Sequence, residues 1–472
     1  MLAAFHNDEY DVADEEEDER ERIFMLQTSL FVVEGMGEKR MKIDHRWKPR
    51  KTRTKYRHSE ALRCIKRDYL GIQGDSLTPL FNGREFDTMF RISRSRFQRM
   101  LQDFGNSGDL FYLDVKDCFG HETASLEARL LLPLKSIAFG VPPHTFRDYF
   151  QMSRTLARDC CTNFNRKIKD LYLEEYLRVP TKDDLVSILK LHRSVHNGVN
   201  GIFGSLDCMH TFWKNCPVAW QGSYKGAKKK PSIVLEAIAD HHLWFWHASY
   251  GYAGTLNDLN ILHLSPLFRK FVDGTFEELE EKVVPFSIGQ EVFNKVFILV
   301  DGIYPRYSRF VKAFKEPITK KEKEFTGFQE AARKDIERAF GVLQGKFQIL
   351  ARPITLMDLT LIGELVACCL ILHNMCVSDR VMDQDVYARY NPAFKVQLEG
   401  EETVDYPDKL PDECIRFTED ALEGIQSRIS INKADSSVRQ LLLQKARWKE
   451  LQALEDYKRL QDAIMDYLWT NP

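Results

Sequence analysis

The sequence predicts an α/β or α+β domain that follows a helical region and precedes a long C-terminal helix. Residues from about 84 to 190 place apolar side chains at helical spacing. From about residue 200, short segments rich in β-branched and aromatic residues are bounded by turn signals, as in strands. Helical patterns then return, and strands followed by helices are typical of these two fold classes.

Length and composition are those of an ordinary globular protein. The 472 residues suggest roughly two to four units at about 100–200 residues each. Hydrophobic residues make up 44% of the chain and charged residues 29%, which is usual for a soluble protein. The net charge of −2 gives no hint of a nucleic-acid partner.

The charge is unevenly distributed at the N-terminus. Residues 8–21 carry ten acids and one base, whereas residues 39–57 carry ten bases and one acid. Such blocks are usually solvated tails, and a basic block also suits nuclear import or phosphate binding. We therefore expect residues 1–58 to form a disordered arm, acidic and then basic, and expect the protein in the nucleus.

Ten cysteines are present, some adjacent and some single, and none forms a C-x-x-C pair. Without a signal-peptide pattern, this predicts reduced and mostly buried thiols in an intracellular protein. The apolar stretches fall short of the roughly 20 residues that span a bilayer. No transmembrane segment and no membrane partner are therefore expected.

Residues 59–195 are predicted to form a helical DNA-binding region. The segment from Ser125 to Gly140 has a helix-capping residue at its start and a glycine at its end. A short helix around Thr145–Phe150 is followed by a turn at Gln151–Met152, and Ser153 is suited to cap a second helix.

This pattern indicates a helix-turn-helix near residues 128–168, although an ordinary helical hairpin would produce it too. The second helix would expose Arg154 and Arg158 to DNA, together with Asn163. Its inward side chains would be Leu156, Cys160 and Phe164.

Residues 196–382 are predicted to form the core domain. Its expected strands are the segments IFGSLD, SIVLEAIAD, LWFWHASYG and VFILVD. The second and third should form a hairpin because they meet at His241–His242. Helices are expected at TGFQEAARKDIERAFGVLQGKF and at LTLIGELVACCLILHNMC.

Two further segments follow this core. Residues 383–430 are acidic and contain prolines, which predicts a linker. Residues 431–472 contain a long amphipathic helix. It could pair with itself or bind a partner, but we expect it to pack on the main body.

Three acids stand out as candidate catalytic residues. Asp207 ends the apolar run IFGSL and Asp301 ends VFILV, so both are expected at the C-terminal edge of a buried strand. Glu337 is expected at the edge of a helix face made apolar by Ala332, Ile336, Ala339, Phe340 and Leu343. The nearby Gly341 would leave room for a ligand beside the carboxylate.

If these carboxylates converge, they would bind two Mg²⁺ or Mn²⁺ ions, because hard cations prefer oxygen ligands. Two such ions suit the cleavage and transfer of a phosphodiester without a side-chain nucleophile. Acids at strand ends are also common as helix caps or ion-pair partners. Asp258 is a rival ligand or an N-cap, and Glu330 is a rival third acid.

Basic side chains near these acids are candidate DNA contacts. Residues 224–230 form a basic loop with Lys225, Lys228, Lys229 and Lys230, which suits a phosphate clamp or a solvated hairpin tip. Arg333 and Arg338 flank Glu337 and could balance its charge or grip the scissile strand.

Histidines and tryptophans are given mainly structural roles. No standard zinc spacing is present among His210, His241, His242, His247 and His263. His373–Asn374 suits packing and hydrogen bonding at a helix end. Tryptophans could stack on bases, but core packing is favoured for Trp244 and Trp246.

Five ordered blocks resemble the Harbinger-type DDE transposases, in the branch called plant transposon proteins. These blocks are GSLDCMHTFWKNCPVAWQG (204–222), LEAIADHHLWFWHASYGYAGTLNDLNIL (235–262), LVDGIYPRYSRF (299–310), QEAARKDIERAFGVLQGKFQIL (329–350) and LHNMC (372–376). The resemblance covers roughly residues 130–382.

This resemblance implies a ribonuclease-H-like catalytic core, a mixed sheet flanked by helices, that follows a helix-turn-helix. It assigns the three family acids to Asp207, Asp301 and Glu337, and 35 residues separate the last two, as is usual in the family. It also implies a Myb-like DNA-binding partner protein. Transposases of this kind usually act as dimers or larger assemblies.

Together these observations predict a metal-dependent DNA transposase or endonuclease that acts on transposon terminal repeats and a target site. A domesticated DNA-binding or adaptor protein is one alternative, because the acids do not reveal whether the protein still mobilises DNA. A two-metal nuclease that acts on another nucleic acid is the other.

Overall fold

The computed structural model describes residues 55–71, 78–113, 116, 120, 122–226, 229–273, 285–382, 445 and 447–471. Apart from Lys55, these residues belong to one unit, Tyr56–Pro472. The expected acidic and basic arm, except for its last residues, and the expected linker at 383–430 lie outside the described residues.

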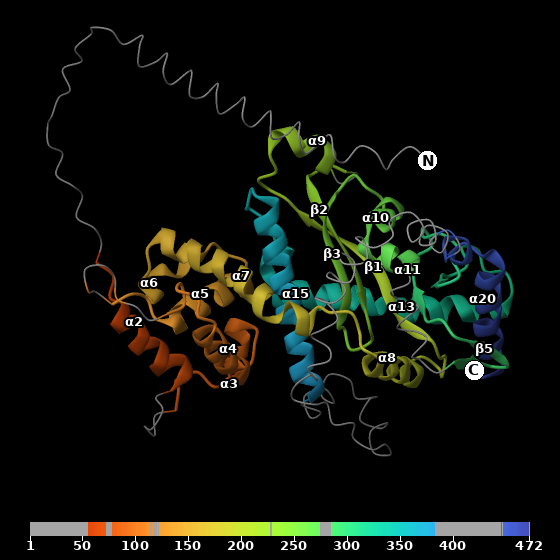
Figure 1. Ribbon diagram of the computed structural model, residues 1–472, viewed down its shortest axis with the longest axis horizontal. Helices are drawn as coiled ribbons and strands as arrows, with labels where there is room; N and C mark the ends of the chain where they lie inside the picture. The colour runs from red at the N-terminus through yellow and green to blue at the C-terminus, as the bar shows by residue number, and fades with distance from the viewer. Residues whose placement is uncertain are drawn as a thin grey trace, which may run out of the picture. The chain divides into compact units, whose positions relative to one another are not determined.

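A series of helices precedes the sheet, as the apolar spacing predicts (Figure 1). In chain order they are α2 (His58–Ile65), the π-helix η1 (Lys66–Leu70), α3 (Gly83–Phe90), α4 (Arg94–Asn106), α5 (Leu126–Phe139), the 3-10 helix η2 (Pro143–Phe146), α6 (Arg147–Phe150), α7 (Arg154–Tyr176) and α8 (Lys182–Val195).

Local capping explains where several of these helices begin and end. The Ser125 hydroxyl accepts a hydrogen bond from the Ala128 N–H at the start of α5. Gly140 ends that helix with a φ of 61°, in the left-handed region that glycine adopts most readily. Both features follow the sequence prediction. Between α3 and α4 the chain leaves helical geometry at Arg91, which has a φ of 62°.

The sheet has five strands in the order β3-β2-β1-β6-β7. β2 pairs antiparallel with both β1 and β3, whereas β6 pairs parallel with β1 and β7. The expected hairpin at His241–His242 is therefore present, and the sheet is mixed. The strands are β1 (Ile202–Phe212), β2 (Ser232–Ala239), β3 (Phe245–Ala253), β6 (Phe297–Leu299) and β7 (Phe310–Val311).

Short elements connect these strands, and β4 and β5 form a separate two-stranded sheet. The connecting elements are η3 (Val218–Trp220), α9 (Gln221–Tyr224), α10 (Asp258–Leu264), α11 (Pro266–Asp273), β4 (Phe286–Ile288) and β5 (Glu291–Phe293). After β7 come α13 (Lys320–Lys346), α14 (Gln348–Ala351), α15 (Leu359–Met382) and α20 (Leu454–Thr470).

Helices pack on both faces of the sheet. On one face, Leu206 and its cross-strand partner Ile238 join a cluster with side chains of α8, α10 and α11. On the other face, Ala237 shares a cluster with Ile336 and Ala339 of α13. The protein is thus a mixed α/β fold with a helix-flanked sheet, and α13 crosses behind the sheet in Figure 1.

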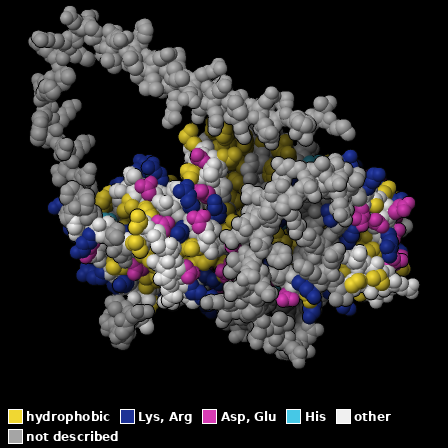
Figure 2. All heavy atoms as spheres, viewed as in Figure 1, with side chains coloured by type: hydrophobic (Ala, Val, Ile, Leu, Met, Phe, Trp, Pro, Cys, Tyr) yellow, Lys and Arg dark blue, Asp and Glu magenta, His cyan; other side chains and the backbone are white. Residues whose placement is uncertain are grey.

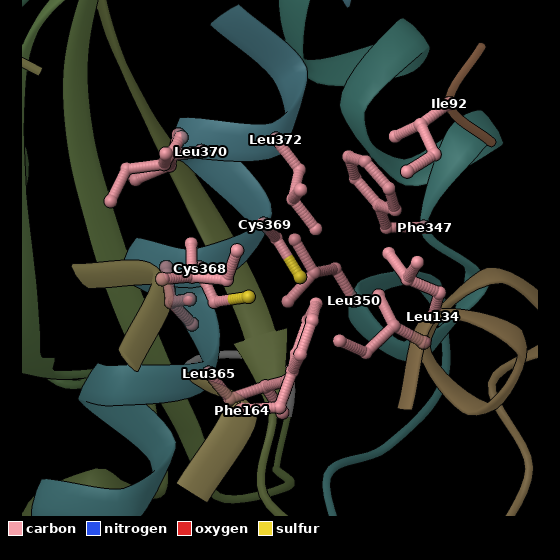
Figure 3. Packing of buried hydrophobic residues seen from close by; sticks show 14 of the residues in the cluster. Ile92, Leu134, Phe164, Phe347, Leu350, Leu365, Cys368, Cys369, Leu370 and Leu372 are labelled. Atoms are coloured by element: carbon pink, nitrogen blue, oxygen red, sulfur yellow. The ribbon is translucent and has the colours of Figure 1, made fainter. Parts of the chain in front are cut away.

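The helical region and the sheet share one hydrophobic core. α15 packs against α7 and β3, and its cluster extends to the helices before the sheet. Figure 3 shows Cys368 and Cys369 of α15 among apolar side chains that include Leu134, Phe164 and Leu350. All eight cysteines among the described residues are free, as expected for thiols that pack as small apolar groups.

One described helix is long and apolar enough to cross a membrane by length and composition alone, which the sequence analysis did not expect. It is Leu359–Arg380 of α15, and 78% of its apolar window is buried inside the protein. A helix that is apolar all round is typical of a protein core as well as of a membrane, and the burial of α15 identifies it as a core helix.

The C-terminal helix packs on the main body, which is the arrangement that we expect from its sequence. α20 contacts α13, β7 and β4, and Leu460, Ile464 and Leu468 are buried in a cluster with Ala332. Before α20, the Leu451 carbonyl accepts a hydrogen bond from the Ser308 N–H at 2.9 Å. The helical pattern is interrupted at Ala453, which precedes α20 in an extended conformation.

Candidate functional site

Asp207 lies in the middle of β1, and not at the end of a strand as the sequence analysis expected. The strand continues to Phe212 because β2 pairs with it as far as Ser232. Asp207 is opposite Ala237, whose side chain lies in the cluster with α13. Since directly paired residues share a face of a sheet, Asp207 is on the face that α13 covers.

Asp301 lies two residues after the end of β6, at the strand end that the sequence predicts. The parallel register pairs Ser205 with Leu299, so Asp207 and Asp301 each follow this pair by two residues. Neighbouring strands of a sheet are about 4.8 Å apart, so β6 ends beside the part of β1 that leads to Asp207. Asp301 is exposed, and its Oδ1 accepts a hydrogen bond from the Gly302 N–H at 2.6 Å.

Glu337 lies on α13, and the apolar face predicted for this helix is buried in full. That face consists of Ala332, Ile336, Ala339, Phe340 and Leu343. The Glu337 side chain is exposed to 48% at the edge of the face. A side chain placed at Gly341 would meet nothing within 4 Å, so the space expected one turn beyond the carboxylate is open.

Arg333 joins two of the three acids. Its Nη1 is 3.7 Å from Asp207 Oδ2, and its Nη2 is 2.9 Å from Glu337 Oε1. The Arg333 side chain is exposed to only 19%. The sequence suggests two roles for Arg333, and the structure shows the one in which it balances the charge of the acids.

The environment of Asp207 opposes its negative charge. Burial raises the pKa of Asp207 to about 6, and the charges of Asp258 and Glu337 add to the increase. The Cys208 N–H, which donates to Asp207 Oδ1 at 2.8 Å, and Arg333 act in the opposite direction. Asp207 is thus a carboxylate that a further cation would stabilise.

Asp258 is a fourth acid of this group. Burial raises its pKa, and the charges of Asp301 and Glu236 raise it further. It is the first residue of α10, whereas the N-cap is Asn257, whose side chain accepts from the Asn260 N–H at 2.9 Å. The sequence alternative of Asp258 as an N-cap is therefore wrong, because the preceding residue has that role.

The other rival acid, Glu330, is exposed on α13. The acids whose charges act most strongly on Asp207 are Asp258 and Glu337. Of the two glutamates considered in the sequence, Glu337 is thus the one that lies with Asp207.

Two further charged residues near these acids escaped the sequence analysis. Lys312, just after β7, donates from Nζ to the carbonyls of Gly302 and Tyr304 at 3.1 and 2.7 Å, beside Asp301. Glu236 of β2 is fully buried and lies 3.1 Å from His247 Nε2. Glu236 falls in the strand segment SIVLEAIAD, where a charged side chain between apolar neighbours was the available signal.

A second cluster of potential ligands lies elsewhere on α13. Among the described residues, one set of three His, Cys, Asp or Glu side chains has its ligand atoms all within 4.8 Å of one another, namely His192, His196 and Asp335. The acids at Asp207, Asp301 and Glu337 do not form such a set. A two-ion site does not require it, because its ligands are shared between ions about 4 Å apart.

A short helix, a turn and a second, capped helix lie where the sequence predicts them. η2 and α6 end at Phe150, Gln151 turns the chain with a φ of 49°, and the Ser153 hydroxyl accepts from the Leu156 N–H at 3.1 Å. Arg154 and Arg158 of α7 are exposed.

The remaining α7 side chains named in the sequence analysis are partly as expected. Cys160 and Phe164 are buried, whereas Leu156 and Asn163 are half-buried. The Asn163 amide donates to the Asp159 carbonyl at 2.9 Å instead of standing free. On the face drawn in Figure 2, basic and acidic side chains are interspersed over the helical region.

The basic loop after α9 is exposed where the structure describes it. Lys225, Lys229 and Lys230 are exposed, and Lys230 Nζ lies 6.0 Å from the centre of the Phe212 ring. Lys228 lies outside the described residues. Arg338 is engaged with Asp335 and with His241 Nδ1, at 3.2 Å from the latter.

The comparisons with known proteins agree with the sequence blocks. The family model described as plant transposon protein matches residues 174–384. A relative from Arabidopsis thaliana, described as Protein ALP1-like, is 21% identical over 317 residues, which cover 66% of this chain and 75% of the relative. No solved structure matches the chain significantly.

Over residues 174–384, which include the helix-flanked sheet, the chain is thus similar to the plant transposon proteins. This similarity agrees with the resemblance to the Harbinger-type transposases that the sequence blocks indicate.

Proposed function

We propose that this protein is a metal-dependent DNA transposase or endonuclease in which Asp207, Asp301 and Glu337 bind two divalent cations. The observation that carries the proposal is the grouping of these acids, from β1, the end of β6 and α13, with Asp258 of α10. Asp207 interacts with Asp258 and Glu337, and Asp258 interacts with Asp301. A ribonuclease-H-like core is part of the proposal, and the mixed strand order β3-β2-β1-β6-β7 supports it.

The residues fit Mg²⁺ or Mn²⁺ by their chemistry. All the proposed ligands are carboxylates, which hard cations prefer. The raised pKa of Asp207 and the guanidinium of Arg333 between Asp207 and Glu337 both indicate a place that attracts positive charge. Asp258 is available as an additional ligand.

Two bound ions would supply an activated oxygen nucleophile and would stabilise the leaving oxygen of the phosphodiester. The chain itself would provide the rigid frame, since Asp207 is held within a paired strand and Glu337 on a helix with a buried face. Arg333 would exchange its contacts with the carboxylates for the scissile phosphate. Lys225, Lys229 and Lys230, with Arg154 and Arg158, would hold the DNA backbone.

The catalytic proposal is tested by nicking of supercoiled plasmid DNA in the presence of Mn²⁺ or Mg²⁺. We expect Asp207→Asn, Asp301→Asn and Glu337→Gln to reduce nicking to background, while Glu330→Gln keeps the wild-type rate. Equal nicking by wild type and all three variants would reject the proposed site.

Running the same assay with single-stranded DNA and structured RNA addresses the substrate. Faster cleavage of RNA than of DNA would favour the alternative of a nuclease on another nucleic acid. If the wild type binds Mn²⁺ and DNA but cleaves none of these substrates, even with a Myb-like protein added, the adaptor alternative is favoured.

We further propose that the protein works in the nucleus with a Myb-like DNA-binding partner, as a dimer or larger assembly on DNA. The family relationship and the ten bases in residues 39–57 support this. Deletion of residues 39–57 from a fluorescent fusion should reduce nuclear accumulation. Unchanged accumulation would argue against the basic block as the import signal.

A further inference from the structure

The cluster of His192, His196 and Asp335 joins elements that are far apart in the sequence. His192 lies in the last turn of α8, His196 caps the C-terminal end of that helix, and Asp335 projects from α13. The two histidines are four residues apart, so they lie on the same face of the helix. Their rings stack with centroids 5.2 Å apart.

The potential ligand atoms are already close together. His196 Nε2 lies 3.3 Å from Asp335 Oδ2, and one ligand atom from each of the three side chains lies within 4.8 Å of the other two. Four ligands that surround Zn²⁺ as a tetrahedron, at about 2.0–2.1 Å from the ion, are roughly 3.3 Å from one another. The separation between His196 and Asp335 therefore suits a shared ion.

His241, in the turn between β2 and β3, lies beside this cluster and contacts both Asp335 and Arg338. Its Nδ1 lies 3.0 Å from the same Asp335 Oδ2. Arg338 donates to the other oxygen, Asp335 Oδ1. This contact holds the Asp335 carboxylate with Oδ2 toward the histidines, as residues behind a metal ligand commonly do.

His192 gives an independent reason to expect a ligand. Its side chain is completely buried, and neither ring nitrogen has a hydrogen-bond partner among the described residues. A buried polar group without a partner costs about 1–3 kcal/mol. The imidazole is thus directed into a cluster of ligands without any protein group to bind it.

We propose that His192, His196 and Asp335 bind one transition-metal ion, with Zn²⁺ as the best fit. Imidazole nitrogen together with one carboxylate suits Zn²⁺, whereas Mg²⁺ prefers oxygen ligands alone. This site is chemically distinct from the one proposed at Asp207, Asp301 and Glu337.

The proposed ion has a structural consequence for α13. It would connect α8 to α13. Its ligand on α13, Asp335, lies two positions before Glu337. Residues two apart on a helix face different directions, so the ion would be held on one side of α13 while Glu337 lies on another. The ion would thereby fix the position of the helix that carries Glu337.

The experiment is a Zn²⁺ titration of the full-length protein, freed of metal with a chelator and monitored by competition with a chromogenic zinc indicator. We expect one tightly bound Zn²⁺ per chain, and at least a roughly tenfold loss of affinity in His192→Ala, His196→Ala and Asp335→Asn. His144→Ala is the matched control, because His144 is an exposed histidine far from this cluster in the sequence. Asp207→Asn should bind Zn²⁺ as the wild type does.

Substitution of Co²⁺ in the wild type covers the case in which the cluster variants do not fold. Intense visible absorption of four-coordinate Co²⁺ with nitrogen ligands is expected, and Zn²⁺ should abolish it. Wild-type affinity in folded His192→Ala, or only the weak spectrum of six-coordinate Co²⁺ in the wild type, would overturn the proposal. Both readouts are independent of DNA cleavage.

Discussion

At the scale of single residues, Asp207 holds a charge that its surroundings disfavour. It is largely buried, and it lies near the acids Asp258 and Glu337. The same environment that raises its pKa would favour the binding of a cation. Stability and metal binding are therefore expected to change in opposite directions when this carboxylate is neutralised.

Replacing Asp207 by asparagine should stabilise the metal-free protein near neutral pH. The pKa of Asp207 is about 6 in the folded protein and 3.8 as an isolated group, so the folded state binds more protons between these values. Its contribution to stability is fully present below about pH 4 and is lost as the pH rises through about 6. Asp207→Asn should thus increase the free energy of unfolding above pH 6 by about 2–3 kcal/mol.

Denaturant unfolding in a metal chelator at several pH values measures this effect. The difference between Asp207→Asn and wild type should shrink toward pH 4, and Glu330→Gln should show no such difference. Destabilisation by Asp207→Asn at neutral pH would contradict the described environment of Asp207.

Arg333 competes with metal ions for the same carboxylates. Its guanidinium contacts Asp207 and Glu337, so a cation at these acids must displace it or share them. We expect Arg333→Gln to bind Mn²⁺ more tightly, by a few-fold, and calorimetric titration measures the change. The exposed neighbour Lys334 provides the control Lys334→Gln. Weaker binding by Arg333→Gln would show that Arg333 supports the ion site instead of competing with it.

Residue positions were predictable where local sequence determines them. The apolar face around Glu337 and the cap at Ser153 follow from helical spacing and from capping chemistry within a few residues. The position of Asp207 within β1 did not follow, because β2 determines how far β1 continues. The cluster of His192 with Asp335 was missed, although the four-residue spacing of His192 and His196 was a usable signal.

At the scale of secondary-structure elements, α15 connects the helical region to the sheet through Asn374. Its side chain accepts from the Phe245 N–H at 3.0 Å and donates to the carbonyls of Phe245 and Tyr176 at 2.9 and 2.6 Å. His373 Nε2 lies 2.8 Å from the Leu243 carbonyl. The pair was expected to form hydrogen bonds at a helix end. It does form them, but within α15, which continues to Met382.

Replacing Asn374 by alanine should destabilise the whole described unit. The N–H of Phe245 and two carbonyls would lose their buried partners, and a small cavity would remain. We expect the free energy of unfolding to fall by about 2–4 kcal/mol in denaturant titrations. Asn163→Ala, at a half-buried asparagine on α7, is the control and should have a much smaller effect. A loss below that of the control would mean that these bonds contribute little.

The turn at Gln151 and the cap at Ser153 were predictable because both are local features. Whether the two helices that they connect bind DNA depends on contacts with the DNA, which the chain alone does not contain. Arg154 and Arg158 are exposed at the start of α7, and phosphate contacts make DNA affinity depend on salt.

Double substitution of Arg154 and Arg158 by alanine should weaken binding to duplex DNA. The slope of the logarithm of affinity against the logarithm of salt concentration should become smaller by about 2, if both contact phosphates. Fluorescence anisotropy at several salt concentrations measures the slope. Lys190→Ala, at an exposed base on α8, is the control, and an unchanged slope in the double variant would exclude this face from the DNA interface.

At the scale of the whole molecule, three separate parts of the chain come together around α13. β1 and the end of β6 contribute Asp207 and Asp301 by their parallel register, and α13 contributes Glu337. α20 and the core helices pack on other parts of α13. Sequence periodicity predicted these elements separately, whereas their convergence depends on strand order and register between distant segments.

The most direct test of this convergence is a crystal structure of the protein grown with Mn²⁺, with anomalous scattering used to locate the ions. We predict anomalous peaks between the carboxylates of Asp207, Asp301 and Glu337, with Arg333 displaced from at least one of its two acids. Well-ordered carboxylates without an anomalous peak at saturating Mn²⁺, and with Arg333 still joining Asp207 to Glu337, would contradict the account.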